Sequence, residues 1–243
     1  MQNVDVYLIL TRNCNFSCSF CIRKNLEIVT STMNLSDVIK ALDIIFEAFP
    51  LSSLILTGCE PLLHHDIYKI IEYSLQKWNK VILTSNGSFS TVTADILKTY
   101  LSENLWLQLS LDGPEEEHDN IRGNGSYRKL INNVTYLKNY CNNIIISTTV
   151  TYNTLNSTIQ LADILNDYDF SFWKVCHEQV EDPKSEDLIN STDWNQFAKD
   201  VLFHCAYPVR IKQFFNLDLM NFALEQGVKP ETYNCGCGKS KIY

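Results

Sequence analysis

The sequence lacks an apolar run close to the ~18 residues that a membrane span needs, and its first residues carry no basic stretch. We therefore expect neither a transmembrane segment nor a secretory signal, and predict a cytosolic protein without a membrane partner. Positive charge is also sparse, because 20 Lys and Arg face 28 Asp and Glu and leave a net charge of −8. No basic cluster is longer than Arg23-Lys24, so nucleic acid is not an expected partner.

Glycine is scarce too, with only eight in 243 residues. Gly58, Gly87 and Gly113 each follow a short β-type run. A glycine just past a strand marks backbone that needs positive φ or a close approach to a ligand. The sequence therefore predicts three similar loops on one rim of a sheet.

The rest of the composition, 45% apolar and 20% charged, is that of a globular protein and excludes a disordered or fibrous chain. Segments with apolar residues at helical spacing alternate with apolar strand-like runs. N-terminal helix caps are predicted at Ser36 and at Ser191-Thr192. This alternation indicates an α/β fold with a parallel sheet, whose ligands bind at the carboxyl ends of the strands. The predicted strands cover residues 6–10, 54–57, 81–84, 107–111, 144–150 and 170–175.

Nine cysteines are many for a cytosolic chain. Their odd number argues against a disulfide framework, so we expect metal ligands, catalytic thiols or small core residues. Cys14, Cys18 and Cys21 have the spacing Cys-x3-Cys-x2-Cys directly after the first predicted strand. Three such thiolates can hold one metal centre and leave a position open for a reacting molecule. On spacing alone, the alternatives are a structural zinc with a distant fourth ligand or a coincidental spacing.

Four segments at successive predicted strand ends resemble those of radical S-adenosylmethionine (SAM) enzymes, most closely the branch with a C-terminal SPASM or twitch extension. The resemblance covers about residues 6–180 in the expected order. The segments are Cys14, Cys18 and Cys21 with Phe20 before the third cysteine, Thr57-Gly58-Cys59-Glu60-Pro61, Thr84-Ser85-Asn86-Gly87, and Ser110-Leu111-Asp112-Gly113-Pro114 followed by His118, Asp119, Arg122 and Gly123.

The resemblance implies a partial (β/α)6 TIM-like barrel over residues 1–180, with residues 181–243 forming a helical segment and the short start of a SPASM/twitch-like extension. It further implies a 4Fe–4S cluster on Cys14, Cys18 and Cys21, to which SAM binds. One electron would then cleave SAM and release a 5′-deoxyadenosyl radical that abstracts hydrogen from the substrate. A dry cavity is needed for such a radical.

The same resemblance assigns the SAM contacts. They are Phe20, Gly58 and Glu60 near the cluster and the methionine amino group, Ser85 and Asn86 at the methionine or ribose end, Ser110 and Asp112 nearby, and Arg122 at the methionine carboxylate. Alternatives from the residues themselves remain open. Glu60 suits the start of a helix, Asn86-Gly87 and Asp112-Gly113 are ordinary turn pairs, and Arg122 could be a surface charge.

Three further cysteines are candidates. Cys59 stands where the family has glycine, and it either narrows the SAM site, adds a catalytic thiol, or is simply tolerated in a tight loop. Cys176, beside His177 at a predicted strand end, is either a core thiol, like Cys141 and Cys205, or a second candidate catalytic thiol. Cys235 resembles the first ligand of an auxiliary iron–sulfur cluster, whose remaining ligands the sequence does not supply.

The resemblance implies modification of a ribosomal peptide or protein by crosslinking, epimerisation or oxidation, with flavodoxin or ferredoxin as reductant. Two alternatives stay open: a radical SAM enzyme that acts on a small metabolite, and a degenerate metal-bearing scaffold that binds a peptide.

Overall fold

One curved sheet with helices along its outer side makes up the described part of the computed structural model, which covers residues 4–21, 31–101, 104–168, 170–178, 189–206, 208–211 and 241–242. The strands are β1 (Asp5–Thr11), β2 (Ser53–Gly58), β3 (Val81–Ser85), β4 (Leu105–Ser110), β5 (Ile144–Val150), β6 (Phe172–His177), β7 (Val209–Ile211) and β8 (Lys241–Ile242). The helices are α1 (Leu35–Ala48), α2 (Ile67–Leu75), α3 (Thr91–Tyr100), α4 (Glu115–Arg122), α5 (Ser126–Lys138), α6 (Leu155–Asn166) and α7 (Ser191–His204), with 3-10 turns η2 (Pro61–Leu63) and η3 (Tyr152–Thr154).

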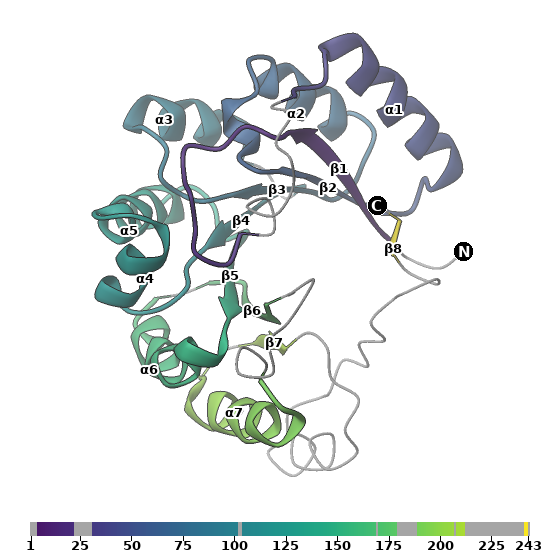
Figure 1. The fold of residues 1–243 in the computed structure, drawn as a ribbon. Coiled ribbons are helices and arrows are strands. Elements are labelled where there is room, and N and C mark those ends of the chain that lie inside the picture. Colours follow the sequence, from purple (N-terminus) through teal and green to yellow (C-terminus); the bar gives the residue numbers. More distant parts are fainter. Residues whose placement is uncertain are drawn as a thin grey trace.

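The strands follow the order β7-β6-β5-β4-β3-β2-β1-β8, and every neighbouring pair is parallel. Figure 1 shows the sheet as an open arc with the helices around its outside, where α5 lies between α3 and α4. The α/β fold and the partial barrel predicted from the sequence are confirmed. The boundary at residue 180 stays a prediction, although β7 and β8 pair with β6 and β1 in the same sheet.

Two details of the sequence prediction were wrong. Asn34, not Ser36, caps α1, because its Oδ1 accepts the Asp37 N–H at 2.9 Å. Asn190 likewise precedes Ser191 as the cap of α7, and its Oδ1 accepts the Asp193 N–H at 2.8 Å. In both cases an Asn side chain reaches the third N–H of the helix, which a residue inside the first turn cannot do.

The helix α4 was not predicted at all. Its eight residues include three consecutive glutamates at the start and lack the apolar periodicity that marks the other helices. Tertiary contacts hold it instead, since His118 and Ile121 are its buried residues.

The two faces of the sheet carry different side chains, because successive residues of a strand point to opposite faces. The outer face packs against the helices in the main apolar core, to which Leu54, Leu56 and Leu83 belong. The inner face has a separate apolar floor made of Ile55, Ile82, Ile145 and Phe172, with Tyr7 and Trp106 packed against it. Polar residues follow this floor toward the carboxyl ends of the strands, where the candidate site lies.

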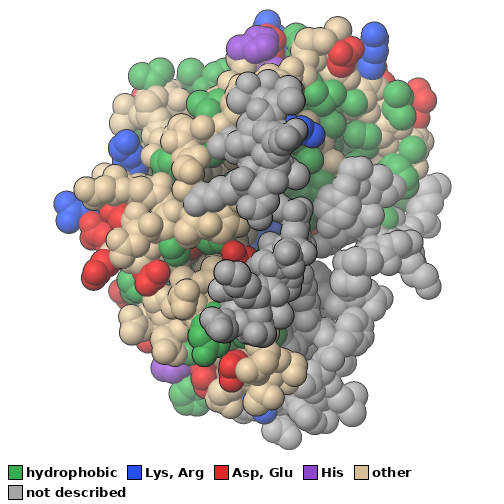
Figure 2. All heavy atoms as spheres, in the orientation of Figure 1, with side chains coloured by type: hydrophobic (Ala, Val, Ile, Leu, Met, Phe, Trp, Pro, Cys, Tyr) green, Lys and Arg blue, Asp and Glu red, His purple; other side chains and the backbone are tan. Residues whose placement is uncertain are grey.

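Charged side chains of both signs are interspersed over the described surface in Figure 2. In the described ranges, no helix is long and apolar enough to cross a membrane.

Candidate active site

The cysteine loop directly follows β1. Cys18 is buried, whereas Cys14 and Cys21 are partly exposed. The Cys14 Sγ accepts the Phe16 N–H at 3.3 Å, and the Cys21 N–H donates to the Cys18 carbonyl at 3.2 Å. Burial raises the pKa of Cys18, Arg122 lowers it, and Cys21 and Cys14 raise it further. Each of these groups is thus close enough to Cys18 to affect its charge.

The donor set of this loop fits an iron–sulfur cluster, because three thiols lie within eight residues and a backbone N–H already bonds to one sulfur. Within the described residues, however, no three Cys, His, Asp or Glu side chains are arranged to hold a metal ion.

The loop after β2 presses against the cysteine loop. Gly58 has φ +142°, and a Cβ at this position would lie 2.5 Å from the Thr11 carbonyl oxygen. The next two N–H groups donate to backbone carbonyls of the same segment, Cys59 to Thr11 at the end of β1 at 3.0 Å and Glu60 to Asn13 in the cysteine loop at 2.9 Å. Gly87 and Gly113 also have positive φ, so the predicted set of three similar loops on one rim is confirmed.

Glu60 ties the loops after β2 and β3 together. Its side chain is 3% exposed. One oxygen accepts the Asn86 N–H at 2.7 Å, and the other accepts the Leu62 N–H at 3.1 Å. Burial raises the pKa of Glu60, and these two backbone N–H groups and the Ser85 side chain oppose the rise. Glu60 caps the η2 turn, as the helix-start alternative predicts; a contact to the methionine amino group stays a prediction.

Asn86 joins the loop after β3 to the cysteine loop. Its side-chain N–H donates to the Asn15 Oδ1 at 2.8 Å, and its own Oδ1 accepts the Ser88 N–H at 2.9 Å. Ser85 lies beside it and accepts the Gly87 N–H at 3.1 Å. Both residues are buried. The Asn86 side chain thus makes the local hydrogen bond expected of a turn residue, and the contact of Ser85 and Asn86 to the methionine or ribose end of SAM stays a prediction.

A buried ion pair connects the loop after β4 to α4. Asp112 is fully buried; one of its oxygens pairs with the Arg122 Nε, and the other accepts the Thr149 N–H at 2.8 Å. The Arg122 side chain is only 9% exposed, so its interpretation as a surface charge was wrong. Its guanidinium carbon lies 5.7 Å from the centroid of the Phe20 ring. The pair thus places a cation between the fourth strand and the cysteine loop.

His118 is a residue to which the sequence analysis gave no role, although it stands in the fourth resembling segment. Its Nδ1 accepts the Asp112 N–H at 3.1 Å, which assigns the ring proton to Nε2. That Nε2 is buried and has no partner among the described residues. Burial lowers the pKa of His118 to about 4, so the ring is neutral at pH 7.

This histidine predicts a pH dependence of stability. Its folded pKa of about 4 lies below the ordinary value of 6.5, so its contribution is present above pH 6.5 and is lost as the pH falls toward 4. The full loss is about 3 kcal/mol at 1.36 kcal/mol per pKa unit. We expect the difference in unfolding free energy between wild type and H118N to change by this amount between pH 7 and pH 4. Denaturant titrations measure it, with exposed His65→Asn as control; parallel pH profiles for wild type and H118N would contradict the assignment.

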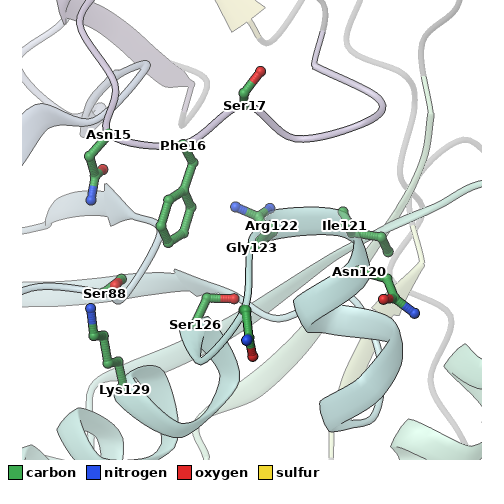
Figure 3. A pocket seen from close by; sticks show the side chains of 11 residues that line it. Asn15, Phe16, Ser17, Ser88, Asn120, Ile121, Arg122, Gly123, Ser126 and Lys129 are labelled. Atoms are coloured by element: carbon green, nitrogen blue, oxygen red, sulfur yellow. The ribbon is translucent and has the colours of Figure 1, made fainter.

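A polar cavity of about 410 Å³ adjoins this rim. Figure 3 shows Asn15, Phe16 and Ser17 of the cysteine loop along one side, and Asn120, Ile121, Arg122 and Gly123 at the end of α4 along the other. Ser88, Asn124, Ser126 and Lys129 complete the lining. Phe16 and Lys129 were not predicted as site residues: Phe16 is a spacer residue between Cys14 and Cys18, and Lys129 lies outside the resembling segments.

Residues 8–165 match the family model of the radical SAM superfamily. The chain belongs to that superfamily. The resemblance predicted from the cysteine spacing and the three later loops is thereby confirmed, as is the prediction that the chain is of an enzyme family.

Curated relatives extend the comparison. The chain is 28% identical over 134 residues to the antilisterial bacteriocin subtilosin biosynthesis protein AlbA of Bacillus subtilis (54% of this chain and 30% of AlbA). It is 29% identical over 152 residues to the AdoMet-dependent heme synthase of Nitratidesulfovibrio vulgaris (61% and 41%). It is 28% identical over 207 residues to the cysteine-type anaerobic sulfatase-maturating enzyme of Clostridium novyi (76% and 54%). The chain spans about a third to a half of the length of these relatives.

Solved structures share the fold. Streptococcus suis SuiB bound to precursor peptide SuiA superposes with a TM-score of 0.77 at 17% identity, covering 98% of this chain and 56% of SuiB. The enzyme anSMEcpe with bound AdoMet gives a TM-score of 0.72 at 19% identity, covering 95% and 68%. The radical SAM family uses a 4Fe–4S cluster and SAM, and structures of both neighbours hold SAM. The cofactors expected from the sequence are therefore those of the family.

The remaining predicted site residues of this radical SAM chain fall in three places. Ser110 ends β4 and pairs in register with Ser147. Cys176 on β6 pairs with Thr149, whose N–H binds Asp112, so Cys176 lies at the same rim. Cys59 is partly exposed in the loop after β2. Cys235 lies outside the described residues, and its role as an auxiliary cluster ligand stays a prediction.

Proposed function

We propose that this chain is the core of a SPASM/twitch-type radical SAM enzyme that modifies a ribosomal peptide or protein. The observation that carries the proposal is the buried Asp112–Arg122 pair beside Cys18, since it joins the fourth-strand loop to the cysteine loop. Glu60 and Asn86 join the second and third loops to the same place. Two relatives whose names specify bacteriocin and sulfatase maturation support a peptide or protein as substrate.

Different residues of the chain would ligate the cluster, bind SAM and position the loops around them. Cys14, Cys18 and Cys21 would hold the cluster, which together with SAM supplies a 5′-deoxyadenosyl radical for hydrogen abstraction. Arg122, held by Asp112 and already beside the cysteine loop, would bind the SAM carboxylate. Glu60 keeps two loops at fixed distance through its two hydrogen bonds. The apolar floor of the inner face excludes water below the reacting groups.

The first test is anaerobic reconstitution with iron and sulfide, followed by SAM and a strong reductant. We expect wild type to form 5′-deoxyadenosine and Cys18→Ala to form none. Cys141→Ala, which removes a partly buried thiol distant in sequence from the loop, is the matched control and should behave as wild type. Zinc without labile sulfide in the purified protein would instead support the metal-bearing scaffold.

The substrate class needs a second measurement. Peptides encoded beside the gene are incubated with the active enzyme, and we expect a loss of hydrogen or an inverted stereocentre by mass spectrometry and chiral analysis. Intact peptides together with conversion of a metabolite would favour the second candidate. The similarity to an AdoMet-dependent heme synthase is the observation on which that candidate rests.

Reductive SAM cleavage requires one electron, so flavodoxin or ferredoxin is proposed as the partner that supplies it. A cytosolic location, where the cysteine thiols stay reduced, remains a prediction from the sequence.

A further inference from the structure

Two cations stand side by side on the inner face of the sheet. The strand register pairs Ser110 with Ser147, Ser147 with Lys174, and Lys174 with Arg210. Lys174 is two residues beyond Phe172, so both side chains point to the face that carries the apolar floor. The Arg210 guanidinium carbon lies 3.9 Å from the centroid of the Phe172 ring, which places Arg210 on this face as well.

Lys174 lacks an acidic partner in the described part of the chain. Its ammonium reaches across β5 and donates to the Gln108 Oε1 at 2.8 Å. Gln108 is neutral, and no described carboxylate forms an ion pair with Lys174. By contrast, an ion pair with an aspartate is formed by each of four other lysines, Lys40, Lys69, Lys77 and Lys98.

The Lys174 ammonium carries an electrostatic cost when no ligand is bound. Lys174 is partly buried, and a partly desolvated charge needs a counter-charge or a full set of hydrogen bonds. The Arg210 guanidinium on the neighbouring strand adds positive charge to the same face. An anion placed against Lys174 would lower this cost and use the ammonium N–H groups that Gln108 leaves available.

The position of the pair suits a substrate group. Lys174 lies one step beyond the apolar floor, and Cys176 follows on the same face at the rim. Cys176 pairs with Thr149, which donates to Asp112, the partner of Arg122. A molecule that enters at the carboxyl ends of the strands and reaches Lys174 therefore passes the residues that surround the SAM site.

We propose that Lys174, flanked by Arg210 and oriented by Gln108, binds a carboxylate of the substrate and so selects an acidic peptide. The inference rests on the proposed function for the peptide nature of the substrate. The carboxylate is that of an Asp or Glu side chain or of the peptide C-terminus. Because the protein carries a net charge of −8, its overall field repels such a group, and a local cation is needed to hold it.

The test measures equilibrium binding by calorimetry to the anaerobically reconstituted protein with SAM and without reductant. The probes are three acetylated alanine heptapeptides: one with a central Glu and an amidated end, one with a central Gln and an amidated end, and one with a central Gln and a free C-terminal carboxylate. We expect wild type to bind at least one carboxylate probe about tenfold more tightly than the neutral peptide, the size of a charge-assisted hydrogen bond. Preference for the first or third probe identifies the side chain or the C-terminus as the source.

Variants then assign the preference to Lys174. Lys174→Met should abolish it, and Lys174→Arg should retain most of it, whereas Lys40→Met on the exposed side of α1 should leave it unchanged. An unchanged preference in Lys174→Met, or no preference in wild type, would overturn the proposal. Circular dichroism and the cluster absorption spectrum check that each variant is folded and loaded.

A non-peptide probe separates this inference from the proposed function. Glutarate carries carboxylates but no peptide bond. Glutarate binding that is lost in Lys174→Met would support the carboxylate site whether or not a peptide is modified. If no peptide were modified in that case, only the proposed peptide function would be contradicted. Peptide modification with the same rate and affinity in Lys174→Met would keep the function and remove the carboxylate site.

Discussion

Gly58→Ala should lower the free energy of unfolding by about 2–6 kcal/mol, the sum of backbone strain and overpacking. The added Cβ would meet the Thr11 carbonyl oxygen at 2.5 Å, and that oxygen also accepts the Cys59 N–H. Relief of the clash therefore pushes the loop after β2 away from the end of β1, where the cysteine loop begins. Denaturant unfolding measures the stability loss, and SAM binding by equilibrium dialysis measures the displacement of the loop.

Gly123→Ala is the matched control. Gly123 also has positive φ, at +117°, but a Cβ there would meet no atom within 4 Å. It should cost only the strain, about 1–3 kcal/mol. The difference between the two variants isolates the contact with Thr11. Equal losses in stability would mean that close approach to β1 is not what requires glycine at position 58.

Asp112→Asn should destabilise the fold by about 3–5 kcal/mol, because it leaves the buried Arg122 guanidinium without a counter-charge. The substitution isolates the charge, since an Asn Oδ1 can still accept the Thr149 N–H that Asp112 binds. We also expect weaker SAM binding, as Arg122 would no longer be held beside Phe20 and Cys18. Thermal unfolding and SAM titration measure the two effects.

An exposed pair of the same chemistry serves as control. Glu115 pairs with Arg128, with side chains 45% and 77% exposed. Glu115→Gln should cost about 0–1 kcal/mol, the range of surface ion pairs. The double variant Asp112→Asn/Arg122→Met should recover part of the stability lost in Asp112→Asn, because it removes the unpaired charge. A double variant less stable than the single one would show that the charge imbalance is not the cause.

The sequence alone determined the fold class and the family, for a physical reason. Apolar runs such as 144–150 belong to strands buried on both faces, and their alternation with helical periodicity allows few architectures. The spacing of Cys14, Cys18 and Cys21 and the glycines after three strands are local features, so they can be read without the fold. The cap at Asn34 was missed because Asn34 and Ser36 are both good capping residues and only backbone geometry chooses between them.

The tertiary structure decided which of the predicted residues act on one another. Three features depend on contacts between segments from different strands: the burial of Arg122 against Asp112, the position of Glu60 between two loops, and the His118 Nε2, which is buried without a partner among the described residues. The same is true of Lys174, which looks like an ordinary lysine in an apolar run until the strand register places it beside Arg210 and above Phe172. Pairing between strands and burial of side chains arise only in the folded chain, so they cannot be predicted from the spacing of residues along the sequence.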